Sequence, residues 1–514
     1  MDKALAPLPD DPETLQAMVR AAWVRAEIAE AQVERYEHII AQLRRLSFGK
    51  RSEKLDNDQL QLGLEDLEQG MAQIDAEREK ADPVVKTCSA RSRRKQRASL
   101  PEHLPHIDVV IEPQSTACPC CARAMHVIGE DVSKRLDVIP AQFRVLVTHR
   151  PKYACRACEG QVVQAPAPAR LIEGGLPTEA MVAHVLVAKY ADHMPLYRQC
   201  QGLARQEIQI DRSTLAFWVG YAAAELTPLW QHMLHTLLAA DLLFIDETRA
   251  PVLDPGRGRT KTGYFWTLAR DDRPWNGCDP PAVVYTYAPG RGGEHARNLL
   301  RSFSGVLQTD GYQVYQSLAQ ARTDIVLAQC WAHARRRFID LAKGGSAPLA
   351  EQALARIARL YAVEAQVHGQ DPATRLAARR THSAPILADL KSWLETSLTQ
   401  VRGRSPTAEA IRYVLSRWVA LTRLLDDGRI ALDTNAVERA MRPIALGRKN
   451  ALFAGSDEGA EHWATIATLI ECCKLNAVNP QTYLEDVLTR LVNGHKQSQI
   501  EQLTPWAWQA AHNP

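Results

Sequence analysis

The sequence predicts an α/β fold in which strands alternate with one helix and are followed by a long helical stretch. Residues from about 241 to 330 have the pattern of three strands, a helix and two further strands, and residues from about 340 to 425 look helical throughout. Two pairs of cysteines ahead of this region indicate a separate small domain. With 514 residues, the chain has room for several domains of ordinary size.

The composition is that of an ordinary folded protein. Hydrophobic residues make up 46% of the chain and charged residues 24%, which argues against extensive disorder. No apolar run approaches the roughly 18 residues of a membrane span, and the amino end lacks a secretory signal. We therefore expect a cytoplasmic protein without membrane contact. In that reducing compartment its 11 cysteines are thiols or metal ligands.

The amino-terminal region, residues 1–75, is expected to be helical. Residues from about 13 to 46 contain no Pro or Gly, and most positions of two heptad seams are apolar. The seams are Leu15, Ala22, Ala29, Tyr36 and Leu43, and Met18, Arg25, Gln32, Ile39 and Leu46. This pattern predicts a short coiled coil, and hence a homo-oligomer. A single amphipathic helix packed on its own protein is the alternative.

A basic linker is expected next, over residues 76–105, and it ends in the proline-bearing segment from Leu100 to Pro105. It carries the first of two basic runs, Arg91, Arg93, Arg94, Lys95 and Arg97. Arg335–Arg337 form the second. The net charge of +3 is small for a nucleic-acid-binding protein. The indication of nucleic-acid binding from charge therefore comes from these two runs. Each run also fits a solvated loop or an exposed helix face.

Residues 106–165 are predicted to bind zinc. Two knuckles of the form Cys-x-x-Cys, each able to supply two thiolates from one tight turn, are separated by a stretch long enough to fold back. Their cysteines are Cys118, Cys121, Cys155 and Cys158. One structural zinc ion would stabilise a segment that has few apolar residues of its own. Cys120, and less readily His126, are substitute ligands.

Residues 166–235 look helical and include a candidate helix-turn-helix over residues 196–220. Asp211 or Ser213 would cap its second helix. Many helix pairs have no role in DNA binding, so this interpretation has a plain structural alternative. Residues 481–514 are expected to form further helices after the α/β region.

The α/β region spans residues 236–480 and contains the helical insertion at about 340–425. Its strands are predicted from continuous apolar or β-branched runs, and its helix from a helical pattern. The strands are Leu242–Ile245, Gly263–Leu268, Ala282–Tyr287, Gly305–Gln308 and Asp324–Ala328, and the helix is Glu294–Phe303. Helix resumes at Asn435 after the insertion.

Three carboxylates occupy positions suited to metal-dependent phosphodiester chemistry. Asp246 and Asp310 each follow a predicted strand, and Glu438 lies near the start of a helix that Asp433, Thr434 or Asn435 would cap. Magnesium prefers such hard oxygen ligands, and two shared ions are a common arrangement. Acidic residues at strand ends are also common without a metal, where they cap turns or pair with basic neighbours.

A cysteine and a histidine, Cys330 and His333, stand at the start of another predicted helix. Their spacing would suit a metal ion, but the sequence supplies only these two ligands there. A packing role at the helix start explains them equally well.

Several blocks occur in an order that resembles the transposases of the insertion-sequence 66 family. They include Phe48–Lys54, the paired cysteines, Tyr190–Arg198, Asp246–Thr248, Thr309–Tyr312, Cys330–His333, Asn435–Arg439, Arg448–Asn450 and Lys474–Asn476. Each block by itself is weak evidence for the family, whereas the ordered set of blocks is specific to it. Arg249, in place of an expected proline, and Cys472–Cys473, in place of a small pair, depart from the pattern.

The resemblance implies an RNase H-like catalytic core with a D-D-E set of acids, which fall on Asp246, Asp310 and Glu438. It also implies magnesium, zinc in the cysteine domain, and binding to the terminal inverted repeats of a mobile element and to target DNA. We expect at least a dimer on DNA, with accessory proteins of the same element as partners. The resemblance brings Cys330 and His333 near the site, with Arg442 and Lys449 as auxiliary residues.

Two other classes of function fit the same pattern. One is a catalytically silent DNA-binding regulator, and the other is an RNase H-like nuclease that cuts DNA but never joins it. Within the transposase reading, Glu247 is an alternative first acid, and Glu458 or Glu461 an alternative third. These alternatives break the block pattern.

The paired cysteines give a first testable prediction. Purified protein should hold about one zinc ion per chain, as a closed site of four thiolates does. Replacing Cys118 and Cys155 with serine should remove the ion and unfold residues of about 106–165. Elemental analysis together with proteolysis measures both effects, and metal-free protein in a fresh wild-type preparation would contradict the prediction.

Overall fold

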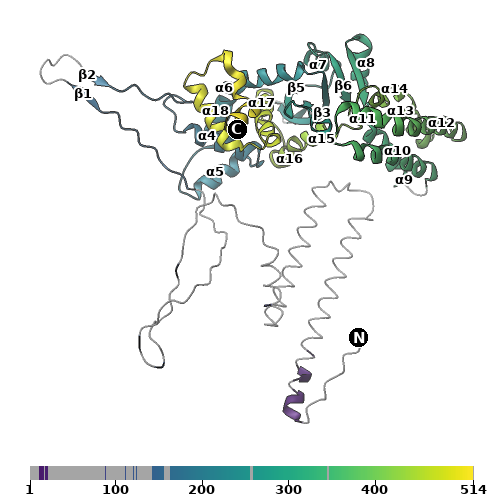
Figure 1. The fold of residues 1–514 in the computed structure, drawn as a ribbon. Coiled ribbons are helices and arrows are strands. Elements are labelled where there is room, and N and C mark those ends of the chain that lie inside the picture. Colours follow the sequence, from purple (N-terminus) through teal and green to yellow (C-terminus); the bar gives the residue numbers. More distant parts are fainter. Residues whose placement is uncertain are drawn as a thin grey trace. The chain divides into compact units, whose positions relative to one another are not determined.

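The structure is a computed structural model that describes residues 142–154, 162–254, 259–343 and 347–512, with residues 11–16 and 18–20 and positions 23, 87, 110, 120 and 123. The chain divides into two compact units, Met1–Thr148 and His149–Pro514. The four paired cysteines, and nearly all of the basic linker and of the predicted coiled coil, lie outside the described residues. The helices and strands below belong to the second unit (Figure 1).

A five-stranded mixed sheet forms the centre of this unit, with the order β5-β4-β3-β6-β7. Its strands are β3 (Leu242–Asp254), β4 (Arg259–Arg270), β5 (Ala282–Ala288), β6 (Gly305–Thr309) and β7 (Ile325–Gln329). β3, β4 and β5 are antiparallel neighbours, and β6 and β7 run parallel to β3. Two short strands, β1 (Lys152–Ala154) and β2 (Val162–Gln164), form a separate antiparallel pair.

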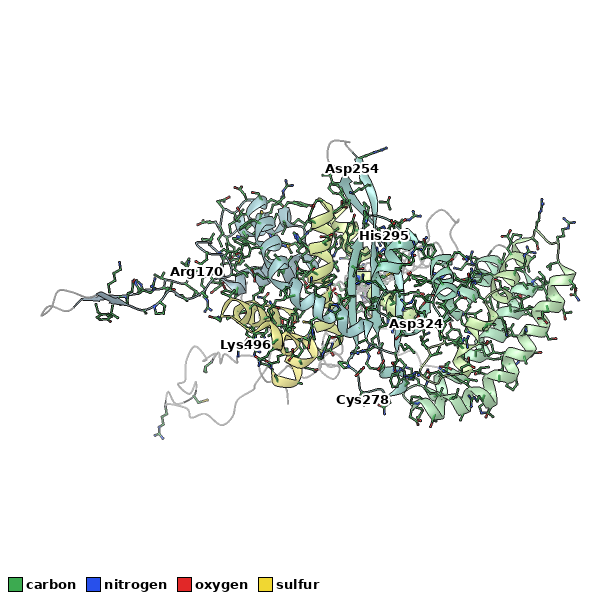
Figure 2. All side chains as sticks on the ribbon, turned by 90° about the horizontal axis from the view of Figure 1, so that it is seen from above. Arg170, Asp254, Cys278, His295, Asp324 and Lys496 are labelled. Atoms are coloured by element: carbon green, nitrogen blue, oxygen red, sulfur yellow. The ribbon has the colours of Figure 1, made fainter. Side chains whose placement is uncertain are left out.

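Five predicted strands are present, but the first was predicted too short. β3 continues for nine residues beyond Ile245 because β4 pairs with it all the way to Asp254 (Figure 2). Its parallel partner β6 pairs only with Leu242–Phe244. The apolar run therefore marked the part of β3 that lies between β4 and β6. Beyond it β3 pairs with β4 on one side, and on the other it has an isolated bridge from Val252 to Ala454. A helix between β6 and β7, α8 (Gln313–Ala321), was not predicted.

Helices flank the sheet on both sides (Figure 1). Before it come α4 (Glu179–Tyr190), α5 (Leu196–Ala204) and α6 (Arg212–Leu238), and within it lie η1 (Arg273–Trp275), α7 (Gly293–Leu299) and α8. After it come α15 (Asn435–Ala440), α16 (Arg442–Ala451), α17 (Asp457–Leu475), α18 (Pro480–Val492), η4 (Gln497–Leu503) and α19 (Pro505–His512). Among the described helices, none is both long and apolar enough to cross a membrane.

The predicted helix pair at residues 196–220 corresponds to α5 and the first part of α6. Asp211 occupies the N-cap position of α6, although its side chain makes no capping hydrogen bond. The helix continues to Leu238, beyond the predicted end, because buried side chains recur along it from Leu215 to Leu238. Much of α6 is thus a core helix of this unit.

Side chains of α17 and its C-cap residue Asn476 take the place of a neighbouring strand along the edge strand β5. Trp230 of α6 adds a hydrogen bond to the carbonyl of Tyr285. Thr468 accepts a hydrogen bond from the N–H of Tyr285, Cys472 bonds both the N–H and the carbonyl of Val283, and Asn476 donates to the carbonyl of Pro281. Four helical residues rise about 6 Å, close to the roughly 6.6 Å that two strand residues span. Side chains four residues apart on α17 therefore reach hydrogen-bonding backbone groups two residues apart at β5.

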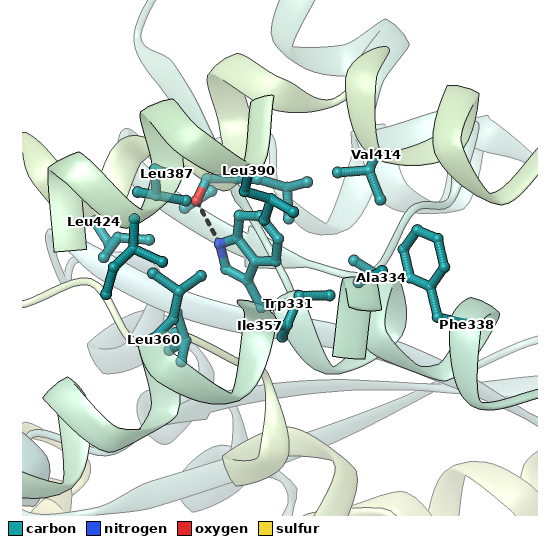
Figure 3. Packing of buried hydrophobic residues seen from close by; sticks show 14 of the residues in the cluster. Trp331, Ala334, Phe338, Ile357, Leu360, Leu387, Leu390, Val414 and Leu424 are labelled. Atoms are coloured by element: carbon teal, nitrogen blue, oxygen red, sulfur yellow. Dashed lines mark hydrogen bonds between the residues drawn. The ribbon is translucent and has the colours of Figure 1, made fainter. Parts of the chain in front are cut away.

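The helical insertion lies between β7 and α15. It comprises α9 (Trp331–Ala342), α10 (Pro348–Val367), α11 (Pro372–Ala378), the π-helix η2 (Arg379–Ser383), α12 (Ala384–Gln400), α13 (Pro406–Leu415), α14 (Trp418–Leu421) and η3 (Arg423–Leu425). Trp331 is fully buried among these helices, and its indole N–H donates to the carbonyl of Leu421 at 2.8 Å (Figure 3). The same apolar cluster includes Phe244 and Ala328 of the sheet. The insertion and the sheet therefore share one core.

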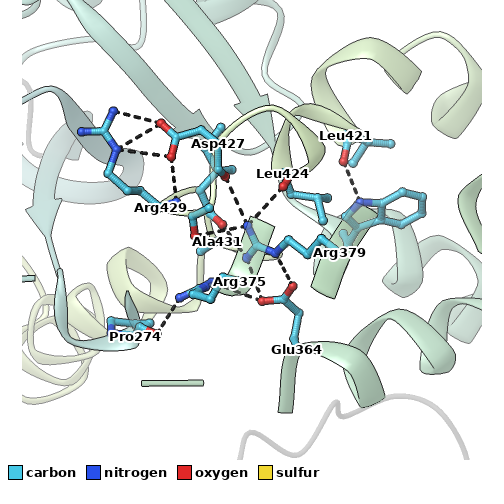
Figure 4. A network of polar contacts seen from close by, with 12 residues as sticks. Pro274, Glu364, Arg375, Arg379, Leu421, Leu424, Asp427, Arg429 and Ala431 are labelled. Atoms are coloured by element: carbon cyan, nitrogen blue, oxygen red, sulfur yellow. Dashed lines mark hydrogen bonds and ion pairs between the residues drawn. The ribbon is translucent and has the colours of Figure 1, made fainter. Parts of the chain in front are cut away.

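A buried arginine fixes the segment that leaves the insertion (Figure 4). Arg379 is fully buried, and its guanidinium makes a bidentate ion pair with Glu364, with N–O distances of 2.6 and 2.8 Å. Its remaining donors reach the carbonyls of Leu424, Asp427, Gly428 and Ile430. One side chain thereby anchors the turn that leads back to the sheet.

Arg379 gives the second prediction. Arg379→Met should destabilise the protein by about 3–5 kcal/mol, because the carboxylate of Glu364 would lose its bidentate partner and keep only Arg375, at 3.2 Å, while four backbone carbonyls would lose their donor. Arg379→Lys should recover only part of this loss, since an ammonium cannot reproduce the bidentate geometry. Chemical unfolding measures the stability, and hydrogen exchange of residues 424–434 reports the local release of the turn.

Lys391→Met is the matched control, because it breaks an ion pair with Glu395 in which both side chains are about half exposed. It should cost less than about 1 kcal/mol. Equal effects of Arg379→Met and Lys391→Met would show that the buried network does not hold this turn.

Candidate active site

Asp246 and Asp310 come together on one face of the sheet, where the parallel pairing of β3 and β6 ends. The last paired residues are Phe244 and Gln308, so two further steps in the same register set Asp246 opposite Asp310. Asp310 directly follows β6, as predicted. Asp246 lies inside β3 and not after its end, which corrects the prediction, but it stands beside the end of β6.

Glu438 reaches the same place although it lies more than a hundred residues further along the chain. It belongs to α15, which packs against β3 and β4. The segment before this helix is fixed to the sheet by Gln308, whose buried side-chain amide both donates to and accepts from the backbone of Ala431, at 3.0 and 2.8 Å. Because Gln308 is two residues before Asp310, the same strand positions both acids.

The raised pKa of Asp246 indicates that the three carboxylates are neighbours. Burial, and after it the charges of Asp310, Glu247 and Glu438, together raise the pKa of Asp246 to about 8. A backbone N–H of Glu247, 2.8 Å from its Oδ1, is the hydrogen bond that the described chain supplies to this side chain. Asp246 is thus a partly buried acid facing other acids, without a basic partner among the described residues.

Glu247 points to the opposite face of β3, as alternation along a strand requires. Its carboxylate lies 2.6 Å from a guanidinium nitrogen of Arg291 and accepts a hydrogen bond of 2.5 Å from the hydroxyl of Tyr315. The ion pair with Arg291 and the hydrogen bond from Tyr315 give Glu247 a structural role. This geometry favours Asp246 over Glu247 as the first acid.

The carboxylate of Glu438 is loosely held. Its neighbours are His333 Nδ1 at 3.6 Å, a guanidinium nitrogen of Arg336 at 3.5 Å and the hydroxyl of Thr434 at 3.4 Å. About a quarter of its side chain is exposed. A carboxylate with only long contacts and access to solvent can take up an additional ligand.

The auxiliary residues fall in different places. The sequence pattern places Arg442 one turn beyond Glu438 on the same helix face. This prediction was wrong, because α15 ends at Ala440 and Arg442 begins α16. Arg442 and Lys449 are both exposed on α16. Arg448, between them in sequence, donates to the backbone carbonyl of Arg249. The run Arg335–Arg337 is exposed on α9, and Arg336 extends to Glu438.

The alternative third acids lie elsewhere. Glu458 and Glu461 are exposed near the start of α17. Neither contributes to the charge around Asp246, whereas Glu438 does. The described geometry therefore supports the set Asp246, Asp310 and Glu438.

The donor set fits a divalent cation. Three carboxylates converge, and burial holds one of them in its neutral form until a positive charge offsets the repulsion. On the same face, Thr267 is the register partner of Asp246, and its buried hydroxyl has no hydrogen-bond partner among the described residues. Hard oxygen donors of this kind suit magnesium. The residues that could hold it are the three acids.

Sequence reasoning missed Gln308 and Thr434. Gln308 ends a predicted strand and looked like an ordinary polar residue, yet it is fully buried. Its function depends on a backbone segment far along the chain, so no local pattern identifies it. Thr434 is the N-cap residue of α15, as one of the three predicted candidates, although its side chain makes no capping hydrogen bond. The sequence did not indicate that its backbone N–H also donates to the sulfur of Cys330, at 3.2 Å.

Comparisons with known proteins agree with this architecture. The model described as Transposase IS66 family matches residues 174–462. The zinc-finger binding domain of transposase IS66 matches residues 115–159, which contain both cysteine pairs, and the IS66 C-terminal element matches residues 468–506. A model described as Transposase C of IS166 homeodomain matches residues 35–109. These matches indicate zinc in the cysteine region and a divalent metal in the core.

Uncharacterised proteins of Sinorhizobium fredii are similar over nearly the whole chain. One, y4jD, is 43% identical, with 98% of this chain and 97% of the relative covered. Another, y4qI, is 42% identical over 98% of each chain. A third, y4hP, is 37% identical over 92% of this chain and 88% of its own. Since one family model covers more than half of the sequence and these relatives cover nearly all of it, the chain belongs to the Transposase IS66 family.

Proposed function

We propose that this protein cuts the ends of a bacterial insertion sequence and joins them to target DNA, and that Asp246, Asp310 and Glu438 carry the chemistry. The observation that supports this most directly is the convergence of three carboxylates beside the carboxyl end of β6. Membership of the transposase family supplies the reaction class, which the acids by themselves do not specify.

The core is proposed to be RNase H-like. Three antiparallel strands followed by two that run parallel to the first, in the order β5-β4-β3-β6-β7, support this assignment. The acids then fall on the central strand, after the neighbouring parallel strand, and on a later helix. That placement is the one that the family resemblance implies.

The three acids would hold two magnesium ions, which when bound activate the attacking oxygen and stabilise the leaving one. The chain's own residues have distinct tasks. Asp246 must lose its proton before it serves as a ligand, because burial keeps it neutral near pH 7. Gln308 fixes the segment before Glu438 relative to Asp310. Arg336, exposed beside Glu438, is placed to contact the DNA phosphate backbone.

DNA is the partner of a transposase, and we propose that this chain binds the terminal inverted repeats in the cytoplasm as at least a dimer. Holding two DNA ends in one complex calls for more than one chain, and the predicted amino-terminal coiled coil offers the contact. One zinc ion held by Cys118, Cys121, Cys155 and Cys158 would stabilise the zinc-finger region. Accessory proteins of the element are further candidate partners.

The third prediction concerns the three acids. Asp246→Asn, Asp310→Asn and Glu438→Gln should each lower cleavage and strand transfer by at least about 100-fold, since loss of one preorganised charge elsewhere costs that much. Combining two of them should add little, because the acids act as a unit. Binding to end DNA should persist. A labelled end duplex with magnesium, together with a gel shift, measures both properties.

Glu395→Gln is the matched control, since Glu395 is exposed on α12 and should retain full activity. Near wild-type cleavage by Glu438→Gln would contradict the assignment of the third acid. Cleavage without any strand-transfer product in the wild type would identify a nuclease, and end binding without cleavage would identify a regulator.

The fourth prediction follows from the pKa of Asp246. In the folded, metal-free protein this carboxyl keeps its proton up to about pH 8, whereas in the unfolded chain it loses it near its ordinary value of 3.8. Between these values the unfolded state binds fewer protons, so folding stability falls as pH rises through this window. Asp246→Asn stays neutral and should therefore be more stable than wild type at pH 8 in magnesium-free buffer.

The advantage of Asp246→Asn should shrink as pH falls toward 4, and added magnesium should reverse it at pH 8 because wild type binds the ion more tightly. Thermal unfolding across a pH series measures the difference. Asp389→Asn, at a half-exposed position on α12, should show no such trend. A difference between Asp246→Asn and wild type that stays constant with pH would contradict the prediction.

A further inference from the structure

A cysteine, a histidine and a glutamate meet beside the acids. Cys330, His333 and Glu438 each present a ligand atom, and the three atoms lie within 4.8 Å of one another. Cys330 and His333 come from the start of α9, and Glu438 from α15. The sequence offered only two ligands at this point, and the fold brings the third.

The separation between His333 and Glu438 suits a shared ion better than a direct hydrogen bond. Nδ1 of His333 lies 3.6 Å from Oε1 of Glu438, which is too long for a good hydrogen bond. Two ligands about 2.1 Å from a tetrahedral zinc ion lie about 3.4 Å apart. Nδ1 is also buried without a hydrogen-bond partner among the described residues, so a lone pair there is free to bind a metal.

The sulfur of Cys330 is in a position that would stabilise a metal-bound thiolate, although burial raises the pKa of the free thiol to about 11. It occupies the N-cap position of α9, where the helix dipole stabilises negative charge, and it accepts a hydrogen bond from the N–H of Thr434. Backbone N–H groups commonly support metal-bound thiolates in this way. A thiolate with an imidazole selects zinc over magnesium.

We propose that Cys330, His333 and Glu438 bind a zinc ion, separate from the zinc-finger region, and that zinc there takes Glu438 away from Asp246 and Asp310. About a fifth of the His333 side chain and a quarter of the Glu438 side chain are exposed, so water can complete the coordination. The site itself rests only on this geometry. Its inhibitory effect rests on the proposed function, because it requires Glu438 to serve the reaction.

Metal stoichiometry of the full chain tests the site without any activity. After equilibration with buffered zinc, wild type should hold one more zinc ion per chain than Cys330→Ser or His333→Gln. With cobalt as the probe, the difference spectrum between wild type and Cys330→Ser should show thiolate charge-transfer and tetrahedral bands. Circular dichroism verifies that the variants are folded, and the zinc-finger cysteines give the same background in all.

Cys200→Ser is the matched control, because Cys200 is a partly buried free cysteine on α5 and should not alter the zinc content. Equal zinc content in wild type, Cys330→Ser and His333→Gln overturns the site. So does a cobalt difference spectrum without thiolate bands, which would leave Cys330 as a packing residue.

Activity tests the consequence separately. In the presence of magnesium, zinc should inhibit end cleavage by wild type, and Cys330→Ser should need a zinc concentration at least about tenfold higher for the same inhibition. Identical zinc sensitivity of the two proteins would overturn the inhibitory role even where the stoichiometry supports the site. Wild type that never cleaves end DNA would instead contradict the proposed function, and the stoichiometry would still decide the site.

Discussion

The architecture of the candidate site depends on how the chain returns from the insertion to the sheet. The segment from Ala431 to Thr434 has no strand partner of its own, yet three contacts fix it across the ends of β6 and β7. Gln308 bonds both backbone groups of Ala431, the N–H of Trp331 donates to the carbonyl of Leu432, and the N–H of Thr434 donates to Cys330. This docking carries Glu438 to the two aspartates, so the arrangement of the acids is only as rigid as these few bonds.

The insertion supports this docking from behind. Arg379 fixes the preceding turn through four backbone carbonyls, and its own charge is balanced by Glu364. Trp331, next to Cys330, is buried in the apolar core that the insertion shares with the sheet. The insertion is therefore a structural part of the site, although it contributes none of the three acids. A loose appendage of the same length could not hold a distant carboxylate within reach of Asp246.

Different contacts cover the two edge strands of the sheet, β5 and β7. At β5, the side chains of Thr468, Cys472 and Asn476 replace a neighbouring strand, so Cys472, which departs from the family pattern, has a structural role here. Burial raises the pKa of this thiol to about 12, so it remains protonated and can both donate to and accept from Val283. At the other edge, the docked segment and α14 lie against the end of β7. Both edges are thus closed by parts of the chain that come after the sheet.

The sequence by itself determined the five strands of the core, most of its helices, the interruption by helices, the family, and the acids beside the sheet. These features leave local traces, because apolar runs, capping residues and short motifs act within a few neighbours. The tertiary structure decided what depends on distant pairing. Only the pairing with β4 places Asp246 inside a strand, and only the register of β3 with β6 sets it opposite Asp310. Alternation on the folded strand then separates it from Glu247. The roles of Gln308, and of Cys330 with His333 beside Glu438, arise from contacts across more than a hundred residues. Such contacts leave no periodicity in the sequence, since each partner's pattern is set by its own local element.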